Sequence, residues 1–515
     1  MVKKEEKFAL QNPVSVAIGK EKEDFTREDL IKVIMDHEIE RITFHYTAID
    51  GKIRELRIPI ANRRQAELVL AEGERVDGSS LFKGFIDVGQ SDLYVVPIYK
   101  TAFFNPFDEG SLDFMCCFLN KDGELADYPP DNILHKANNL LKKNTGLELH
   151  ALSELEFYLI GHFDDNNYPL GSQKGYHATA PFVKGGQILD EMLRYITQIT
   201  GSVKYAHNEV GHIDNIQSDF SSLSGKSAEQ KEIEFLLSPI EDTANNVIIS
   251  SWIIRNVAHK YGFLASFFPK IEIGHAGNGL HFHTALKKNG KNIMTDEKGD
   301  LSKEAKMLIG GLCQYASSLT AFGNTVPASY LRLVPGQEAP TKVCWSEMNR
   351  SALIRVPLAW TKINNLASRV NPQQKDRLER DESRQTVELR SPDGSANAHL
   401  LLSGITMAAE WGLTNEENAL ELSKNSHVSV NIHGSSLEQE LPNLAQSCVE
   451  SSEKLLQERA LYERQNIFPS KVIGFVAESL QNENDQYLNN RLMSLDEEER
   501  TFQSRRIMHR DLHKY

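Results

Sequence analysis

The chain has 515 residues, and its 57 Lys and Arg against 71 Asp and Glu give a formal net charge of −14. Hydrophobic residues make up 40% and charged residues 25%, which is typical of a soluble globular protein. The length exceeds one ordinary domain and predicts two or three. The acidic balance, without a basic cluster interleaved with aromatic residues, argues against a nucleic-acid partner.

The five cysteines include no C-x-x-C pair. They therefore offer neither a zinc site nor a disulfide framework, and they suit a reducing compartment. The first residues, Met1 to Lys7, are charged and are not followed by the apolar core of a signal peptide. No apolar run approaches the ~18 residues that a membrane span needs. We therefore expect a cytoplasmic protein with no membrane partner.

The N-terminal part of the chain is expected to form a small α+β module over residues 26–128, preceded by a polar arm over residues 1–25. The C-terminal boundary of this module is expected at Tyr128-Pro-Pro130, because prolines interrupt regular secondary structure. Apolar spacing and turn residues predict a helix, two strands around an Asp50-Gly51 turn, a loop of small residues and two further strands, at residues 28–37, 41–60, 76–85, 91–98 and 114–119.

Residues 129–515 mix strands with helices and are expected to form the larger domain. Asp131 is placed to cap the first of these helices. The pattern predicts further helices at 245–261, with Gly262 as C-cap, and at 303–322, polar loops at 218–230 and 371–384, and a mostly helical, charged region from 415 onward.

The most informative strand of this larger part is residues 150–159. Alternate side chains of a strand share a face, so Glu154 and Glu156 point the same way. Two carboxylates side by side on a largely buried strand repel each other and are costly to desolvate, and a divalent cation removes both problems. If this stretch is taken alone, the alternative to a cation site is that both glutamates lie at a solvent-exposed edge of the sheet.

Later segments repeat the acidic pattern with imidazoles added, at Glu209, Glu232, His281, His283 and Glu388. Each of these residues, taken alone, could have a purely structural role. A single histidine can be hydrogen-bonded in the core or at the surface, Glu232 can be a solvated helix residue, and Glu388 can form an ion pair with Arg390. Together they form a set dominated by carboxylates, which suits Mg²⁺ or Mn²⁺. Enzymes that transfer phosphoryl groups commonly bind two such ions.

Several arginines fit the same chemistry. Arg332 shares a Gly/Pro-containing loop with Glu338, and Arg350 and Arg355 follow in the next segment. The guanidinium fork binds both oxygens of a carboxylate or phosphate, although structural salt bridging is the alternative for any one of them. The chain has no G-x-x-x-x-G-K-[ST] motif or kinase loop set. The phosphates of ATP, if it is used, must then be held mainly by metals and arginines.

Six motifs between about residues 42 and 412 resemble, in order, the signatures of the glutamine synthetase family. They are Val76-Asp-Gly-Ser-Ser80 with Gly89-Gln-Ser-Asp92, Lys174-Gly-Tyr176, Asn256-Val-Ala-His-Lys-Tyr-Gly262, Gly277-Asn-Gly-Leu-His-Phe-His283, Arg332-Leu-Val-Pro-Gly-Gln-Glu-Ala-Pro340 and Asn349-Arg-Ser-Ala-Leu-Ile-Arg355. The resemblance implies a small N-terminal β-grasp domain followed by a large α+β catalytic domain. It also implies homo-oligomeric rings, dodecamers or decamers, with active sites between subunits.

The implied reaction joins ammonium to the γ-carboxylate of glutamate with ATP, through a γ-glutamyl phosphate. The resemblance implies two or more Mg²⁺ or Mn²⁺ ions per active site, one held by Glu156, Glu209 and Glu232 and another by Glu154, His281 and Glu388. It implies glutamate contacts at Glu156, Gly277, His281, Arg332 and Arg390, and ATP contacts at His283, Arg350 and Arg355. The implied ammonium pocket is Asp77, Ser80, Tyr176, Glu209 and Glu338, and the implied catalytic residues are Asp77, Glu338 and Arg350.

The chain also departs from the family pattern. Ala276 stands where the family usually has Asn, which bears on one glutamate contact. Insertions are expected near residues 210–231 and 361–385, and residues 425–430 have no Tyr for adenylylation. Two alternatives remain: a sister ligase that joins glutamate to a larger amine, and a non-catalytic structural or regulatory paralogue. The first would be expected to lose the acidic pocket and the second to lose metal ligands.

Overall fold

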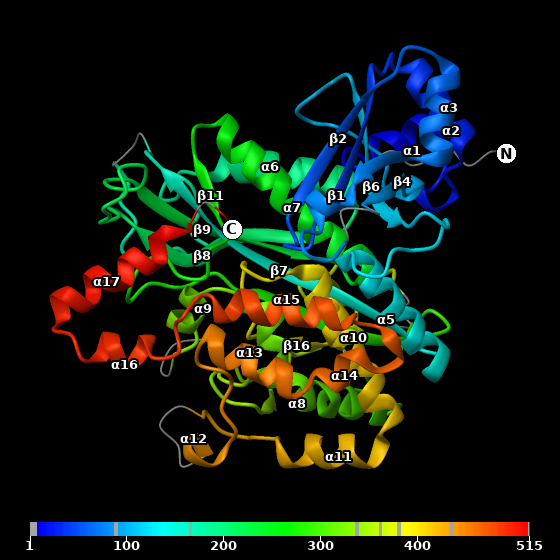
Figure 1. The fold of residues 1–515 in the computed structure, drawn as a ribbon. Coiled ribbons are helices and arrows are strands. Elements are labelled where there is room, and N and C mark those ends of the chain that lie inside the picture. The colour runs from blue at the N-terminus through cyan, green and yellow to red at the C-terminus, as the bar shows by residue number, and fades with distance from the viewer. Residues whose placement is uncertain are drawn as a thin grey trace.

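The structure of the protein is a computed structural model. It describes residues 8–86, 91–163, 167–334, 339–359, 363–378, 383–432, 437–512 and 514. The described residues form two β-sheets with helices around them (Figure 1). The smaller sheet belongs to the N-terminal part of the chain, and the larger sheet carries the residues on which the sequence analysis depends.

The smaller sheet has six strands in the order β2-β1-β6-β4-β3, with β5 paired to β6. The predicted strand pair is confirmed, because β1 and β2 are antiparallel around Asp50-Gly51. The strands are β1 (Arg41–Thr47), β2 (Ile53–Pro59), β3 (Glu74–Asp77), β4 (Asp92–Pro97), β5 (Phe103–Phe104) and β6 (Ser111–Leu119), and the helices are α1 (Pro13–Ile18), α2 (Arg27–Asp36), α3 (Arg63–Glu72) and α4 (Gly78–Leu81).

The small-residue loop predicted at residues 76–85 is wrong in part. Its first residues complete β3, where Val76 pairs with Leu93, and a single helical turn, α4, follows. The Asp77 side chain starts this turn by accepting a hydrogen bond from the backbone N–H of Ser79 at 2.9 Å. An Asp followed by small residues favours a capped turn as much as an open loop.

The larger sheet has ten strands, with the long β7 (Glu148–Gly161) near its centre. Its main path is β14-β15-β16-β12-β7-β9-β8, and the short strands β10 and β11 pair with β7 and β13 with β12. The remaining bounds are β8 (Val203–Ile213), β9 (Ser227–Phe235), β10 (Ser238–Pro239), β11 (Leu264–Ser266), β12 (Leu280–Lys288), β13 (Lys291–Asn292), β14 (Trp345–Glu347), β15 (Ile354–Val356) and β16 (Val387–Leu389).

Helices cover both faces of this sheet: in Figure 1, α6 and α7 lie above it, and α8, α10, α13 and α15 lie below it. Among the described residues, no helix combines the length and the apolar character needed to cross a membrane. The bounds are α5 (Pro130–Thr145), α6 (Gly186–Thr200), α7 (Ile240–Lys260), α8 (Lys303–Gly323), α9 (Pro327–Arg332), α10 (Ala398–Thr414), α11 (Glu416–Asn425), α12 (Leu437–Glu440), α13 (Cys448–Gln457), α14 (Arg459–Glu463), α15 (Ser470–Gln481), α16 (Leu488–Met493) and α17 (Glu497–Arg510).

Three predictions in the larger part need correction. Asp131 does not cap α5, because Pro129 occupies the N-cap position and α5 begins at Pro130, whose missing N–H costs nothing there. The helix predicted at 245–261 begins earlier, at Ile240. Its predicted glycine cap is confirmed: Gly262 has φ +76°, and the backbone N–H groups of Gly262 and Phe263 donate to the last turn of the helix at 3.0 Å and 2.9 Å.

The polar loop predicted at 218–230 ends early, because β9 begins at Ser227. Glu229 and Lys231 on this strand are buried and form an ion pair with an N···O distance of 2.7 Å. The charged residues of this strand predict a solvent-exposed loop, because the sequence does not show that two of them neutralise each other in the interior.

Candidate active site

Cross-strand register gathers acidic side chains on one area of the larger sheet. Glu154 on β7 lies opposite His281 on β12, and Glu156 lies opposite Glu232 on β9. On the far side of β9, Glu232 lies opposite His207 of β8. Directly opposed residues of antiparallel strands project to the same face. Four neighbouring strands therefore present carboxylates and imidazoles to one space.

That space is a cavity of about 380 Å³. Among the residues singled out in the sequence, those that line it are Glu154, Glu156, Tyr176, Glu209, Glu232, Gly277, His281, Arg332, Arg350, Arg355, Glu388 and Arg390. His283 lies beside the lining and places its Nε2 3.0 Å from Glu154. Asp77 and Ser80 are not part of the described lining; Ser80 instead donates to Asp77 at 2.7 Å. Glu338 lies outside the described residues.

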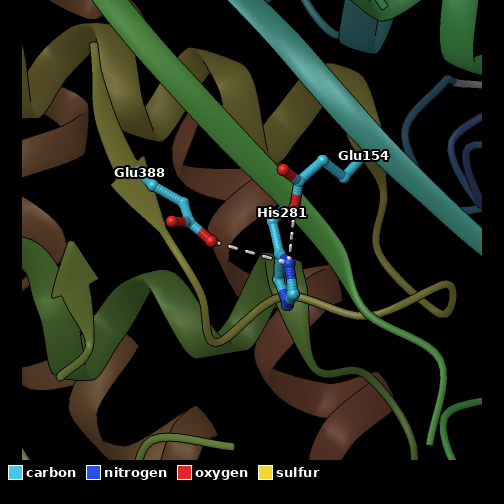
Figure 2. A group of neighbouring side chains, drawn as sticks. All are labelled: Glu154, His281 and Glu388. Atoms are coloured by element: carbon cyan, nitrogen blue, oxygen red, sulfur yellow. Dashed lines mark hydrogen bonds and ion pairs between the residues drawn. The ribbon is translucent and has the colours of Figure 1, made fainter. Parts of the chain in front are cut away.

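Glu154, His281 and Glu388 form one group in the cavity, with one ligand atom from each lying within 4.8 Å of the others. His281 Nδ1 is 3.0 Å from Glu154 and 3.7 Å from Glu388, and Figure 2 shows the three side chains converging from three strands. Burial favours the neutral acid, but the charges of His283 and His281 outweigh it and hold the pKa of Glu154 well below its usual range. Two carboxylates and one imidazole at this spacing fit a hard divalent cation with ligands at about 2.0–2.6 Å.

A second group consists of His207, Glu209 and Glu232. His207 Nδ1 lies 3.8 Å from the carboxylate of Glu209, and His207 Nε2 lies 3.4 Å from that of Glu232. Burial and repulsion from Glu154 and Glu156 raise the pKa of Glu232 to about 8, against its hydrogen bond with His207. Burial opposes the charged imidazole, but the hydrogen bond and charge of Glu232 raise the pKa of His207 to about 9. Glu232 and His207 therefore share a proton that the pair retains at neutral pH, as expected where carboxylates lie close together.

Glu156 faces the same cavity, and its predicted role as a metal ligand stays a prediction. Its carboxylate accepts hydrogen bonds from the backbone N–H of Gly279 at 2.9 Å and from Gln230 at 3.2 Å. In the described structure, His207 takes the place beside Glu209 and Glu232 that the sequence analysis gave to Glu156. Glu156 stands opposite Glu232 and can complete that group from the neighbouring strand.

The arginines meet the acidic groups from the other side of the cavity. Arg355 and Arg390 contact the two oxygens of Glu388, at 2.9 Å and 3.0 Å. Arg332 is buried and donates to His281 Nε2 at 3.2 Å, and burial lowers its pKa. The cavity therefore places guanidinium groups next to a cluster suited to cations, an arrangement that fits an anionic substrate with a bound metal.

A glycine-containing wall closes one side of the cavity. Residues 274–277, called the 274–277 wall below, all line it. A Cβ at Gly277 would lie 2.3 Å from the carbonyl oxygen of Pro269 and 3.1 Å from Arg332, so only glycine fits there. Ala276, which replaces the usual Asn, accepts a hydrogen bond from the hydroxyl of Tyr158 through its carbonyl oxygen at 2.8 Å.

Sequence reasoning missed several residues of the cavity lining, among them His207, Tyr205 and Gln230. His207 precedes Glu209 by two positions, so the alternation used for Glu154 and Glu156 would have found it once β8 was recognised as a strand. Gln230 was missed because its segment was assigned to a loop.

Comparison with known proteins identifies the family. The family model described as "Glutamine synthetase, beta-Grasp domain" matches residues 38–121, and that described as "Glutamine synthetase, catalytic domain" matches residues 127–494. The chain belongs to the glutamine synthetase family. The predicted fold class, a β-grasp domain followed by an α+β catalytic domain, is confirmed. The domain limits at residues 25, 128 and 515 stay a prediction.

Two curated glutamine synthetases show the extent of the similarity. The enzyme of Pyrococcus horikoshii is 31% identical over 395 residues, 75% of this chain and 79% of its own length. The enzyme of Escherichia coli K12 is 28% identical over 484 residues, 87% of this chain and 93% of its own length.

Among solved structures, a Plasmodium falciparum glutamine synthetase has 22% identity and a TM-score of 0.71, covering 90% of this chain and 97% of its own. A structure described as "GmaS/ADP complex" has 19% identity and a TM-score of 0.69, covering 92% of this chain and 98% of its own. These two likenesses show the fold. The family makes this protein an ATP-dependent carbon–nitrogen ligase, and such ligases typically use a divalent metal.

Proposed function

We propose that the enzyme ligates ammonia to the γ-carboxylate of glutamate, giving glutamine, ADP and phosphate. One observation carries this proposal: the cation-binding group of Glu154, His281 and Glu388 shares its cavity with Arg332 and Arg390. A carboxylate is a poor electrophile because its oxygen does not leave readily. Phosphorylation supplies a leaving group, and the surrounding cationic groups stabilise the charge that moves.

The proposed metal ligands are the two groups described above, with Glu156 joining His207, Glu209 and Glu232. Bound Mg²⁺ or Mn²⁺ would neutralise phosphate oxygens of ATP. Arg332 and Arg390 would hold the carboxylates of glutamate, since both guanidinium groups face the cavity. Arg350 and Arg355 would balance the charge of the transferred phosphoryl group.

The amine would enter beside Tyr176 and Glu209, on the acidic side of the cavity. Negative charge there favours NH₄⁺ over neutral amines. A carboxylate removes one proton, and the nitrogen lone pair then attacks the carbonyl carbon of the γ-glutamyl phosphate. The C–N bond forms as the C–O bond to phosphate breaks, the phosphate leaves with the electron pair, and the protonated amide nitrogen then releases a second proton to solvent. The assembly proposed is a homo-oligomeric ring with active sites between subunits.

The closest competing function is ligation of a larger amine, since 28–31% identity to glutamine synthetases does not fix the amine. Ammonium and larger amines are both cations at neutral pH, but a larger amine also brings an apolar substituent against the charged lining of the cavity, which favours ammonium. A non-catalytic role is disfavoured by the convergence of Glu154, His281 and Glu388.

The decisive experiment compares kcat/KM for ammonium with that for a panel of primary amines, at saturating glutamate, ATP and Mg²⁺. Production of ADP and the mass of the product are measured together. We expect glutamine as the product, with ammonium preferred by at least about tenfold, because an amine substituent must enter a charged site. A larger amine with the higher kcat/KM contradicts the ammonium assignment. Absence of ADP with every amine contradicts catalysis itself.

A further inference from the structure

Helix α17 lies outside the region that the catalytic family model matches, which ends at residue 494. In Figure 1 this helix begins at the edge of the molecule and runs back toward β8 and β9. Its last residues pack against the segment that leads into the 274–277 wall. A part of the chain beyond the family match therefore touches the support of the active site.

Polar contacts join α17 to residues 271 and 272. Arg505 Nε lies 3.0 Å from each carboxylate oxygen of Glu272, and His509 Nε2 lies 2.9 Å from the carbonyl oxygen of Ile271. Glu272 is 6% exposed, so its ion pair with Arg505 is only weakly screened by solvent. These contacts fix the segment immediately before the wall.

Glu272 passes this restraint on to the wall itself. One of its oxygens also accepts a hydrogen bond from the backbone N–H of Ile273 at 2.9 Å. The next residue, Gly274, has φ +75°, and the chain then enters the cavity lining. The carboxylate thus ties α17 to Ile273, the residue immediately before the wall.

Apolar packing holds the end of this region at the same place. Leu512 is 1% exposed and belongs to a cluster separate from the main core, with Ile213, Ile216, Leu223, Phe268, Ile271, Val326 and Ala328 among its members. The backbone carbonyl of Leu512 accepts a hydrogen bond from Ser266 at 2.7 Å. Ala328 lies in α9, whose last residue is Arg332, so the cluster also supports the helix that presents this arginine.

We propose that α17 positions the glutamate side of the active site, with Arg505 as the positioning residue. It acts through Glu272 on the 274–277 wall and does not line the cavity described here. Arg355, the proposed ATP-binding residue, is held by other elements. It lies on β15, which pairs with β16, and α17 contacts neither strand among the interactions described. Loss of the Arg505–Glu272 pair should therefore weaken glutamate binding selectively. This selectivity rests on the proposed function.

The test uses four full-length variants: Arg505→Ala, Arg505→Lys, Glu272→Gln and the control Arg506→Ala. Arg506 is the neighbouring residue of the same helix, and its guanidinium lies 5.7 Å from the ring of Phe502. Circular dichroism and size-exclusion chromatography first show that each variant is folded and assembled like the wild type. Steady-state kinetics then give KM for glutamate and for ATP, and kcat, and hydrogen exchange reports on the amides of residues 273–279.

We expect Arg505→Ala and Glu272→Gln to raise the glutamate KM about tenfold, the size of one lost charged hydrogen bond, while the ATP KM and kcat change less than about twofold. Exchange at residues 273–279 should accelerate in both. Arg505→Lys should recover part of the loss, and Arg506→Ala should resemble the wild type in both measurements.

Unchanged exchange at residues 273–279 in folded Arg505→Ala overturns the positioning role. So does faster exchange with an unchanged glutamate KM, and so does an equal rise of the glutamate and ATP KM values, which marks general loosening. Failure of the proposed function looks different: the wild type itself would form no glutamine, while hydrogen exchange would still report whether α17 holds the wall.

Discussion

At the scale of single residues, the main feature of the site is the close approach of several carboxylates on neighbouring strands. Burial of Glu232 and the charge of the neighbouring carboxylates raise the pKa of the Glu232–His207 pair, so this pair retains a proton at neutral pH. A divalent cation does the same work without protons. Metal binding at this cavity should therefore release protons, and it should weaken as the pH falls.

Replacing Glu156 by Ala tests this reasoning. The variant should lose at least about a hundredfold in kcat/KM, because a cation-binding carboxylate and its hydrogen bonds to Gly279 and Gln230 disappear together. Glu148→Ala is the matched control: Glu148 is on the same strand, outside the cavity, where it pairs with Lys142 at 3.4 Å. Mg²⁺ titrations of activity are the measurement. Near-normal turnover of Glu156→Ala at modest Mg²⁺ would remove this residue from the ligand set.

Lys270 permits a prediction about pH. It is 2% exposed, its amine donates to the carbonyl oxygen of His275, and burial lowers its pKa from 10.5 to about 8. Between pH 8 and 10.5 the unfolded chain keeps this proton and the folded protein releases it. The free energy of unfolding should therefore rise with pH across this window, by up to about 3 kcal/mol, whereas below pH 8 the buried charge costs stability.

The measurement is urea unfolding of the wild type and Lys270→Met at pH 7.5 and at pH 10. Other groups titrate in the same window, so the informative quantity is the difference between the two proteins. We expect Lys270→Met to gain stability relative to the wild type at pH 7.5 and to lose most of that advantage at pH 10. An equal pH dependence in both proteins would contradict the assignment.

At the scale of elements, we propose that two arginine-bearing segments contact different parts of the substrates. Arg332 ends α9 and touches His281, whereas Arg350 precedes β15 in a separate turn. Arg350→Ala should lower kcat more than it raises the glutamate KM, because it removes an interaction with the transferred phosphoryl group. Arg332→Ala should show the reverse balance. A glutamate KM that dominates the Arg350→Ala defect would exchange the two roles.

The elements also show how far sequence patterns reach. β7 and β12 were predicted correctly because Glu154 and Glu156, like His281 and His283, alternate between apolar neighbours. β9 was misread because its ion pair of Glu229 and Lys231 is buried, and no local pattern shows that pairing. Long-range register, which brings His207 opposite Glu232, depends on which strands become neighbours.

At the scale of the whole molecule, the described chain leaves part of the predicted site apart from the cavity. Asp77 caps a turn in the small domain, where hydrogen bonds from Ser79 and Ser80 lower its pKa to about 2. The carboxylate is fully ionised at neutral pH and exposed, so it is available to a cation or to another subunit. We propose that Asp77 completes the cavity of a neighbouring subunit in a ring.

Mixing two inactive variants tests this arrangement. Asp77→Ala and Glu156→Ala subunits should each form no glutamine alone. If they are unfolded and reassembled together in equal amounts, each shared site draws Glu156 from one subunit and Asp77 from its neighbour. Each residue is intact in half of the subunits, so roughly a quarter of the sites in randomly mixed rings are complete. If Asp77 serves its own chain only, every site carries one defect and none recovers. Glutamine formation near a quarter of the wild-type value supports the shared site, and mixed rings of confirmed composition that stay inactive rule it out.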